Sequence, residues 1–234
     1  MKTMSRRAAW LSTTMLVAAS ASASAATAYF DRVATLPVYA TLPQGADPAS
    51  QTAAEIVTAT ADGMQLIFTD SPGKRIAFVD IADPAAPKPA GSIAMQGEPT
   101  SVTVVGPVAL VGVNTSESKA NPSGHVAVVD IAGQAVVATC DVGGQPDSVA
   151  ASRDGRFLAV VVENERDEEL NDGKIPQMPA GHLAVLDLGA NGRPTNCDAA
   201  RIVALTGLAE IAADDPEPEF VDELGLGKIG RAHV

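Results

Sequence analysis

The chain has 234 residues, of which 46% are hydrophobic and 3% aromatic, and its formal net charge is -12. This apolar content is too high for a disordered chain and is enough for the core of one or two domains. Acidic residues outnumber basic ones by 28 to 16. The charge therefore argues against nucleic-acid and anionic-membrane partners, because both are bound through Lys and Arg.

The first 28 residues have the organisation of an export signal. They begin with Lys2, Arg6 and Arg7, continue with a mostly apolar stretch at 8–19, and end in small residues that suit cleavage. The apolar stretch is too short to span a bilayer, and no later stretch approaches the required length. We expect cleavage and a periplasmic or secreted protein, with a retained anchor as the alternative. The Arg pair leaves both Sec and twin-arginine export open.

The middle of the chain repeats with a period of about 45 to 50 residues, which is typical of stacked supersecondary units. Three apolar segments end alike, in Asp and an aliphatic residue: 75–81, 125–131 and 182–188. A strand-like segment follows each of them: 91–95, 135–142 and 201–205. Another precedes each of them: 65–70, 109–114 and 157–164. A fourth strand begins each unit, at residues 54, 99 and 146, and the pattern restarts at 218.

Four strands in each unit of this length predict an all-β fold, a β-propeller with four-stranded antiparallel blades. The expected blades are 54–95, 99–142 and 146–205, with a further blade starting at 218. Asp62-Gly63 and Asp154-Gly155 lie between the first and second strands, where a tight hairpin needs positive φ. A solenoid or sandwich of similar strands is the alternative.

The end of the sequence suggests a truncation after about three blades. Residues 229–234 match the translation of a sequencing-library adapter, so we interpret 223–234 as a non-native tail. Three blades cannot close a ring, since propellers need at least four. We therefore expect 29–222 to be the partial propeller of a longer protein.

Several strings in these units resemble those of exported propellers of the choice-of-anchor type I group: 114–118, 163–168 and 214–222. The blades also resemble YVTN-like repeats, although that tetrapeptide is absent. The resemblance runs from about residue 33 to 222 and implies a propeller. Members of this group are often labelled alkaline-phosphatase-like or placed near the phytase-like esterases. Because one fold hosts many functions, the resemblance leaves the activity open.

Short catalytic motifs give no support to a particular enzyme. The sequence lacks Gly-x-Ser-x-Gly, His-Glu-x-x-His, Cys-x-x-Cys and Arg-His-Gly. His125 and His182 each follow a glycine at equivalent strand starts, and we interpret them as surface turn residues, with a catalytic base as the alternative. We expect a module that binds a small molecule, a phosphoester or a protein. A metal-dependent phosphoesterase is the alternative, because metal-bound water could attack without a protein nucleophile.

Aligned oxygen-bearing residues suggest a metal site at one mouth of the propeller. One set, at the starts of the first strands, comprises Glu55, Thr100, Asp147 and Glu219. A second set, at the ends of the second strands, comprises Asp70, Asn114 and Asn164. Rings of oxygens suit a hard cation, so we predict Ca²⁺ as the cofactor. Capping of turns by the same side chains is the alternative.

The segment 163–173 adds six acidic residues within eleven positions. Asp167, Glu169 and Asn171 alternate as oxygens do in an EF-hand, but Asp172 and Met178 replace the required glycine and glutamate. We reject an EF-hand and retain a looser calcium loop, with a solvated acidic loop as the alternative.

Cys140 and Cys197 are the only two cysteines in the chain. An exported protein with two cysteines can pair them once, and the two residues lie in corresponding hairpins of successive units. A disulfide between them and two free thiols both remain open.

Overall fold

The computed structural model describes residues 31–174 and 177–205. The expected export signal, Glu219, the start of a further blade at 218 and the tail 223–234 lie outside these residues. Within the described parts, no helix is long and apolar enough to cross a membrane.

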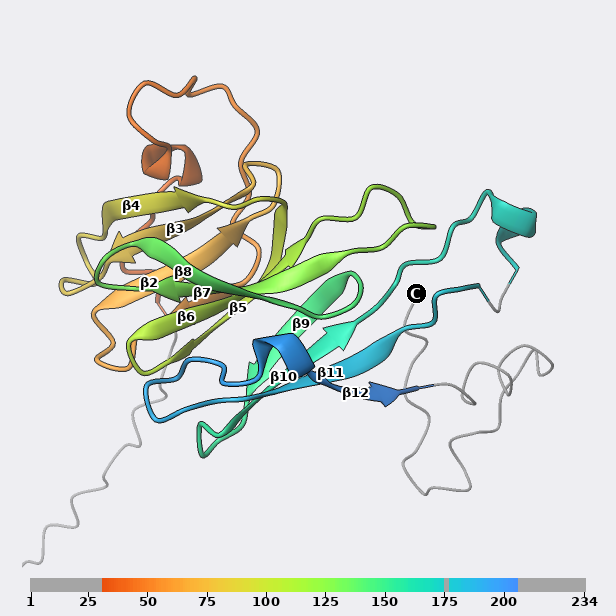
Figure 1. Cartoon of the computed structure of the whole chain (residues 1–234). Coiled ribbons are helices and arrows are strands. Elements are labelled where there is room, and N and C mark those ends of the chain that lie inside the picture. The colour runs from red at the N-terminus through yellow and green to blue at the C-terminus, as the bar shows by residue number, and fades with distance from the viewer. Residues whose placement is uncertain (1–30, 175–176, 206–234) are drawn as a thin grey trace, which may run out of the picture. The chain divides into compact units, whose positions relative to one another are not determined.

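Three four-stranded antiparallel sheets form the structure, each with its strands in chain order (Figure 1). The first sheet comprises β1 (Val57–Ala59), β2 (Gln65–Asp70), β3 (Arg75–Asp80) and β4 (Lys88–Ala94). The second comprises β5 (Glu98–Val105), β6 (Val108–Asn114), β7 (Gly124–Asp130) and β8 (Ala135–Asp141). The third comprises β9 (Pro146–Ala151), β10 (Phe157–Val162), β11 (His182–Asp187) and β12 (Arg201–Ala204). This topology confirms the predicted all-β fold and its propeller blades.

Short 3-10 helices lie in the connections: η1 (Val38–Thr41), η2 (Leu170–Gly173) and η3 (Cys197–Ala199). Thr41 in η1 is one of the few buried polar residues, because its backbone and hydroxyl oxygens bind Arg75 of the first sheet.

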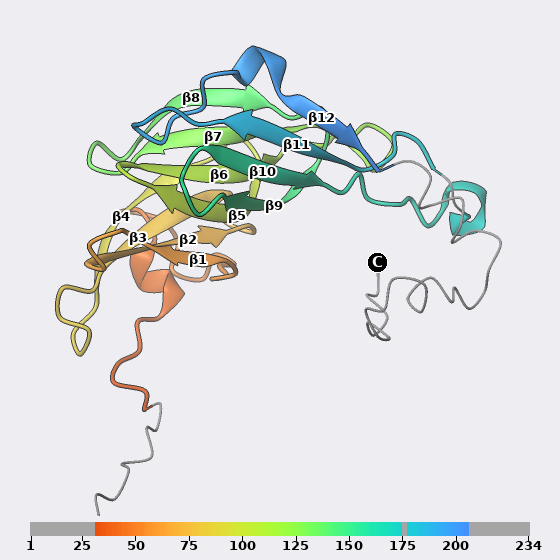
Figure 2. The same cartoon turned by 90° about the horizontal axis from the view of Figure 1, so that it is seen from below.

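The sheets pack face to face, with the second sheet between the other two (Figures 1 and 2). Strand β6 shows why, because successive side chains of a strand point to opposite faces. Val108 and Leu110 join the core shared with the third sheet. Ala109, Val111 and Val113 join the core shared with the first sheet. A continuous aliphatic strand thus buries both of its faces.

The predicted Asp-Gly hairpins are present in the first and third sheets. Gly63 and Gly155 both have φ of 69° and donate from their N–H to a residue three positions earlier, over 2.8 Å in each case. A carboxylate fixes each turn, because Asp62 Oδ1 accepts from Met64 N–H and Asp154 Oδ1 from Arg156 N–H. Hydrogen bonds from Ser152 and Arg156 lower the pKa of Asp154 to about 2.

Strand β1 begins at Val57, three residues later than predicted. The Thr69 hydroxyl explains the difference, because its Oγ1 accepts from Ile56 N–H at 3.1 Å in place of a backbone carbonyl. The Glu55 N–H still donates to Thr69 O at 3.2 Å. The segment therefore runs beside β2 without a regular ladder.

Candidate functional site

The starts of the first strands are equivalent in the ladders of the three sheets. In each sheet a valine of the first strand pairs with the equivalent residue of the second strand: Val57 with Phe68, Val102 with Val111, and Val149 with Val160. Counting back two residues from each valine gives the first predicted set: Glu55, Thr100 and Asp147. The register thus supports the alignment on which this set was predicted.

Thr100 and Asp147 are each skipped by the ladder of their sheet. The pairing passes from Pro99 to Ser101 in β5, and from Pro146 to Ser148 in β9. These irregularities have the form of β-bulges, which re-aim side chains and are frequent beside functional sites. The Thr100 hydroxyl donates to Pro146 O of the third sheet at 2.8 Å, whereas the Asp147 side chain is exposed.

Glu55 is exposed beside the turn between β2 and β3. Its carboxylate accepts from the Ser71 hydroxyl, whose oxygen also lies 2.8 Å from Pro99 O of the second sheet. Glu55 therefore lies at the boundary between the first two sheets.

Asp70 does not share a register position with the other two members of its predicted set. It lies opposite Arg75, whereas Val113 and Val162 lie opposite the equivalent His125 and His182. Asn114 comes one residue after this position and Asn164 two residues after it. A shift of one residue turns a side chain to the other face of a strand, so the predicted alignment is offset here.

Both carboxylate oxygens of Asp70 are occupied by groups of the protein. Oδ1 accepts from Ala53 N–H at 2.9 Å and Gly73 N–H at 3.1 Å. Oδ2 accepts from Arg75, with Nε at 2.8 Å and Nη2 at 2.7 Å. The residue is fully buried. These contacts fit a structural ion pair.

The two asparagines fix nearby backbone. Asn114 Oδ1 accepts from Ser116 N–H at 2.9 Å within its own loop. Asn164 Oδ1 accepts from Gln145 N–H, and its Nδ2 donates to Ala180 O, both at 3.0 Å. Asn164 has φ of 51°, which ends β10 two residues earlier than predicted. These bonds match the turn-capping alternative.

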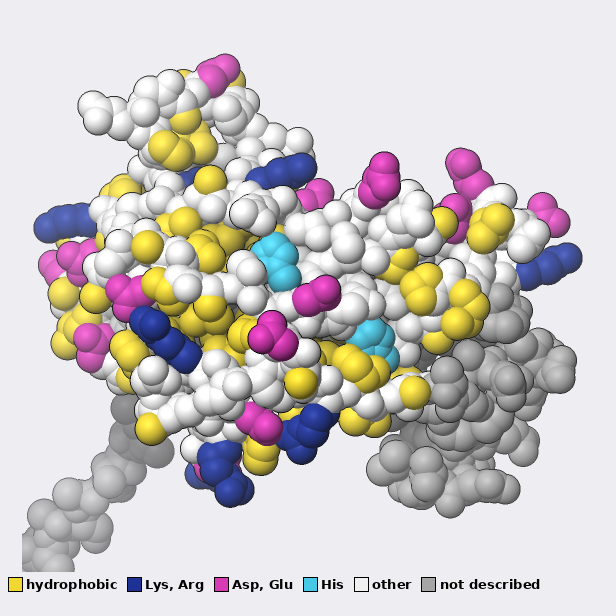
Figure 3. Space-filling model, in the orientation of Figure 1, with side chains coloured by type: hydrophobic (Ala, Val, Ile, Leu, Met, Phe, Trp, Pro, Cys, Tyr) yellow, Lys and Arg dark blue, Asp and Glu magenta, His cyan; other side chains and the backbone are white. Residues whose placement is uncertain are grey.

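The acidic connection between β10 and β11 projects from the third sheet, and several carboxylates gather over it (Figure 3). Asp167 Oδ1 accepts from Glu169 N–H at 3.0 Å, while Glu169 and Asn171 are exposed. Asn171 and Asp172 have φ of 53° and 58°. The carboxylate of Asp167 thus shapes its own loop.

Two electrostatic contacts of this connection were not foreseen from the sequence. Lys119 of the second sheet's β6–β7 loop pairs with Glu165 at 3.0 Å, which raises the pKa of Lys119. The pKa of the Glu163 carboxyl is also raised, by partial burial first and then by the charges of Asp147 and Glu165. Asp147 and Glu163 lie 16 positions apart in the sequence, and the strand pattern alone does not indicate that their charges interact.

The two histidines differ in their surroundings. His182 Nε2 lies 2.8 Å from Val142 O of the second sheet and so joins two blades. Burial lowers the pKa of His125, while Asp141, its partner across the ladder, opposes the shift. Both are more than surface turn residues, since each is partly buried at a strand start.

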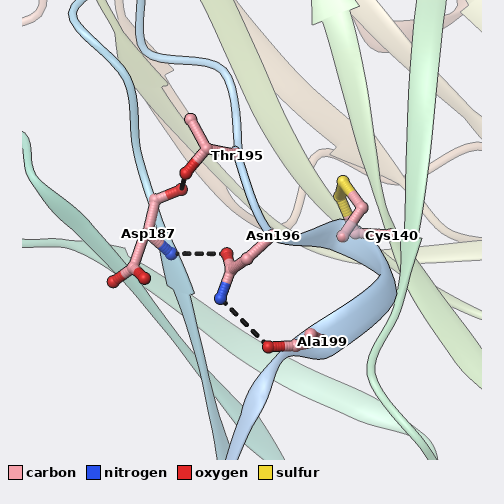
Figure 4. The surroundings of a disulfide bond; sticks show 6 residues. Cys140, Asp187, Thr195, Asn196 and Ala199 are labelled. Atoms are coloured by element: carbon pink, nitrogen blue, oxygen red, sulfur yellow. Dashed lines mark hydrogen bonds between the residues drawn. A yellow bond between two sulfur atoms is a disulfide. The ribbon is translucent and has the colours of Figure 1, made fainter.

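A disulfide joins Cys140 of β8 to Cys197 of η3, across 57 residues of sequence. Cys140 is fully buried in the core between the second and third sheets. Figure 4 shows how η3 is held, with Asn196 accepting from Asp187 N–H at 2.8 Å and donating to Ala199 O at 3.1 Å. The bond therefore links two neighbouring blades near their outer strands.

The predicted ligands that lie in the described part of the chain do not form a compact group of acidic side chains, and the predicted metal site stays a prediction. Within residues 31–174 and 177–205, no three His, Cys, Asp or Glu side chains lie close enough together to hold a metal ion. Asp70 and Asn164 are taken up by hydrogen bonds, and Glu219 lies outside the described part. The exposed carboxylates of Glu55, Asp147 and Glu163 remain available to solvent cations.

Comparison with solved structures gives distant similarities. A hydrazine synthase from Kuenenia stuttgartiensis is 18% identical, with a TM-score of 0.45, over 64% of this chain and 37% of that one. A protein of unknown function from Desulfotomaculum acetoxidans is 12% identical, with a TM-score of 0.44, over 63% and 41%. A Bacteroides fragilis protein described as a 6-phosphogluconolactonase is 14% identical, with a TM-score of 0.46, over 68% and 41%. The chain thus spans well under half the length of each of these structures.

Comparison by sequence identifies the family. No curated protein matches the chain. The family model of the choice-of-anchor I domain matches residues 55–213, which include all three sheets. The match covers more than half of the sequence and agrees with the resemblance noted in its repeated strings. The chain therefore belongs to the choice-of-anchor I domain family.

Proposed function

We propose that this β-propeller repeat protein acts as an exported binding or scaffold module and associates with Ca²⁺ at the blade ends that carry Glu55 and Asp147. Its family indicates an exported or surface protein. The observation that carries the proposal is that exposed Asp147 and Glu163 lie close enough for their charges to interact, since the Asp147 charge adds to the effect of burial in raising the pKa of Glu163. A cation there would relieve this repulsion.

The affinity of this association is weak. Only exposed carboxylates are available, and two such groups supply fewer oxygens than the six to eight that Ca²⁺ prefers. Extracellular calcium modules with incomplete charge bind at about 0.1 to 1 mM. We therefore propose that Ca²⁺ reduces the repulsion between the carboxylates, and that the surfaces of the blades bind the partner.

Thermal unfolding with and without Ca²⁺ tests the proposal. Ca²⁺ at 100 times its dissociation constant adds about 2.7 kcal/mol to the free energy of unfolding. Asp147→Asn and Glu163→Gln should each weaken this response. Asp198→Asn, which neutralises an exposed carboxylate in η3, is the matched control and should leave it unchanged. If Ca²⁺ does not raise the melting temperature of the unsubstituted protein, calcium association is wrong.

The phosphoesterase alternative rests on the family resemblance and on the acidic residues that could hold a metal with an attacking water, and hydrolysis of 4-nitrophenyl phosphate distinguishes it. A binding module gives no turnover with or without Ca²⁺. Turnover that chelation abolishes and Asp147→Asn diminishes would instead establish a metal-dependent phosphoesterase. A calcium-dependent rise in melting temperature without turnover is the result expected here.

A further inference from the structure

The outer face of the third sheet is apolar and open. Strand pairing shows which positions of the second and third sheets are equivalent. Val108 corresponds to Phe157, because they pair with the equivalent residues Asp130 and Asp187. Cys140 corresponds to Val203, because they pair with the equivalent residues Val126 and Leu183. The second sheet's face toward the third is fully buried at Val108, Leu110, Val126, Val128 and Cys140. The equivalent positions of the third sheet are only partly buried or exposed: Phe157, Ala159, Leu183, Val185 and Val203. Residues that form an interface in one blade thus form a surface in the next.

The packing of β9 on the second sheet shows how a first strand docks on such a face. Val149 donates from its N–H to Ser101 Oγ at 3.2 Å and is only 7% exposed. Thr100 Oγ1 donates to Pro146 O at 2.8 Å. A proline at the first position and a buried valine at the fourth therefore anchor the strand to the preceding blade.

The same pattern recurs once more in the sequence. Pro218-Glu219-Phe220-Val221 repeats Pro146-Asp147-Ser148-Val149 and Pro99-Thr100-Ser101-Val102 at the first and fourth positions. Ser148 corresponds to Ser101, but its side chain is exposed, whereas Ser101 is only 6% exposed. The acceptor that would receive a further strand is thus present on the open face.

The chain is long enough to bring this segment to the open face. The described part ends at Leu205, after β12 at the outer edge of the sheet. The residues between it and Pro218 can span about 40 Å when extended. Recrossing four strands from β12 to β9 requires only about 14 Å, at about 4.8 Å per strand.

We propose that Pro218–Val221 docks on the open face of the third sheet as the first strand of a further blade. The proposal places Val221 over Ala159 and Val161, with its N–H directed at Ser148 Oγ in the way that the Val149 N–H is directed at Ser101 Oγ one blade earlier. Val161 is 42% exposed, while Thr69 at the equivalent position of the first sheet is fully buried beneath the second. This placement is independent of the calcium proposal.

Cysteine cross-linking in the chain 29–234 tests the proposal. Ser148→Cys with Val221→Cys should form an intramolecular disulfide in glutathione buffer at least tenfold more readily than Ser148→Cys with Asp214→Cys. The chain segments that the two disulfides would close, 148–221 and 148–214, have nearly the same length, so the entropy lost on closing them is nearly equal. The pair Ser101→Cys and Val149→Cys shows how readily a disulfide forms at a contact between two blades that the structure contains. Equal cross-linking of the 214 and 221 pairs would overturn the proposal, as would a disulfide between two copies, which would identify a second chain as the occupant.

A fluorescence measurement tests the same contact without cysteines. The only tryptophan of the sequence is Trp10, so a tryptophan introduced into 29–234 is a unique reporter. Val221→Trp should emit at shorter wavelength and be about threefold less quenched by acrylamide than Leu224→Trp. Ser148→Asp in the Val221→Trp protein should remove this difference. Equal emission and quenching at the two positions would show that the face is covered otherwise.

Discussion

Asp70 and Arg75 form a buried ion pair across the turn between β2 and β3, with Nη2 2.7 Å from Oδ2 and side chains that are 0% and 4% exposed. Arg75 Nη1 also donates to Thr41 O at 2.6 Å. The pair therefore connects η1 to the first sheet, and neither charge has access to bulk water.

Replacing one partner of this pair should be strongly destabilising. Asp70→Asn leaves the guanidinium of Arg75 buried without a counter-charge, which costs about 3 to 5 kcal/mol. Asp187→Asn is the matched control, because its pair with Arg201 is exposed and such pairs contribute about 0 to 1 kcal/mol. Urea unfolding monitored by circular dichroism measures both. Equal losses for the two substitutions would contradict a special role for the buried pair.

The difference between Asp70 and the two asparagines shows where the sequence was sufficient and where it was not. Alternating or continuous Val and Ala residues were enough to predict most strands, because every blade buries them in the same way. The ends of the second strands could not be aligned, since a short turn at 71–74 follows Asp70 and long loops follow Asn114 and Asn164. Loops of different length hide register shifts of one residue at Asn114 and two residues at Asn164, and a shift of one residue decides which face a side chain occupies.

The charges around Asp147 illustrate a second limit. The sequence indicated an acidic loop, but Glu163 and Asp147 belong to separate strand ends, and only the bulge in β9 and the course of the loop relate them. The contact of Lys119 with Glu165 likewise joins loops of different blades. Tertiary placement of loops is therefore the part that strand periodicity leaves undetermined.

Reduction of the disulfide between Cys140 and Cys197 should lower the free energy of unfolding by about 2 to 4 kcal/mol, because the open chain gains conformational entropy in the unfolded state. Urea unfolding with and without reductant gives the difference. Thiol titration of the oxidised protein under denaturing conditions should find no free cysteine. Two titratable thiols in protein purified without reductant would contradict the bond.

The glycines of the two Asp-Gly hairpins should resist substitution for conformational reasons. Gly63 has open space around it, so Gly63→Ala should cost about 1 to 2 kcal/mol through the left-handed backbone alone. Gly63→Asn should cost less, because asparagine tolerates this conformation. Melting temperatures of the two variants provide the comparison. A larger loss for Asn than for Ala would show that the side chain, and not φ, governs the turn.

The raised pKa of Glu163 gives a pH dependence whose sign is defined. The folded protein holds this proton more tightly than the unfolded chain, so the carboxyl contributes stability that is fully present below its usual pKa of 4.5 and lost as the pH rises through the folded pKa. Asp147→Asn removes a like charge and should lower the pKa of Glu163. Asp198→Asn should not. Carbon-13 NMR titration of the carboxyl groups measures the shift, and an unchanged Glu163 pKa in Asp147→Asn would show that the charge of Asp147 does not contribute to it.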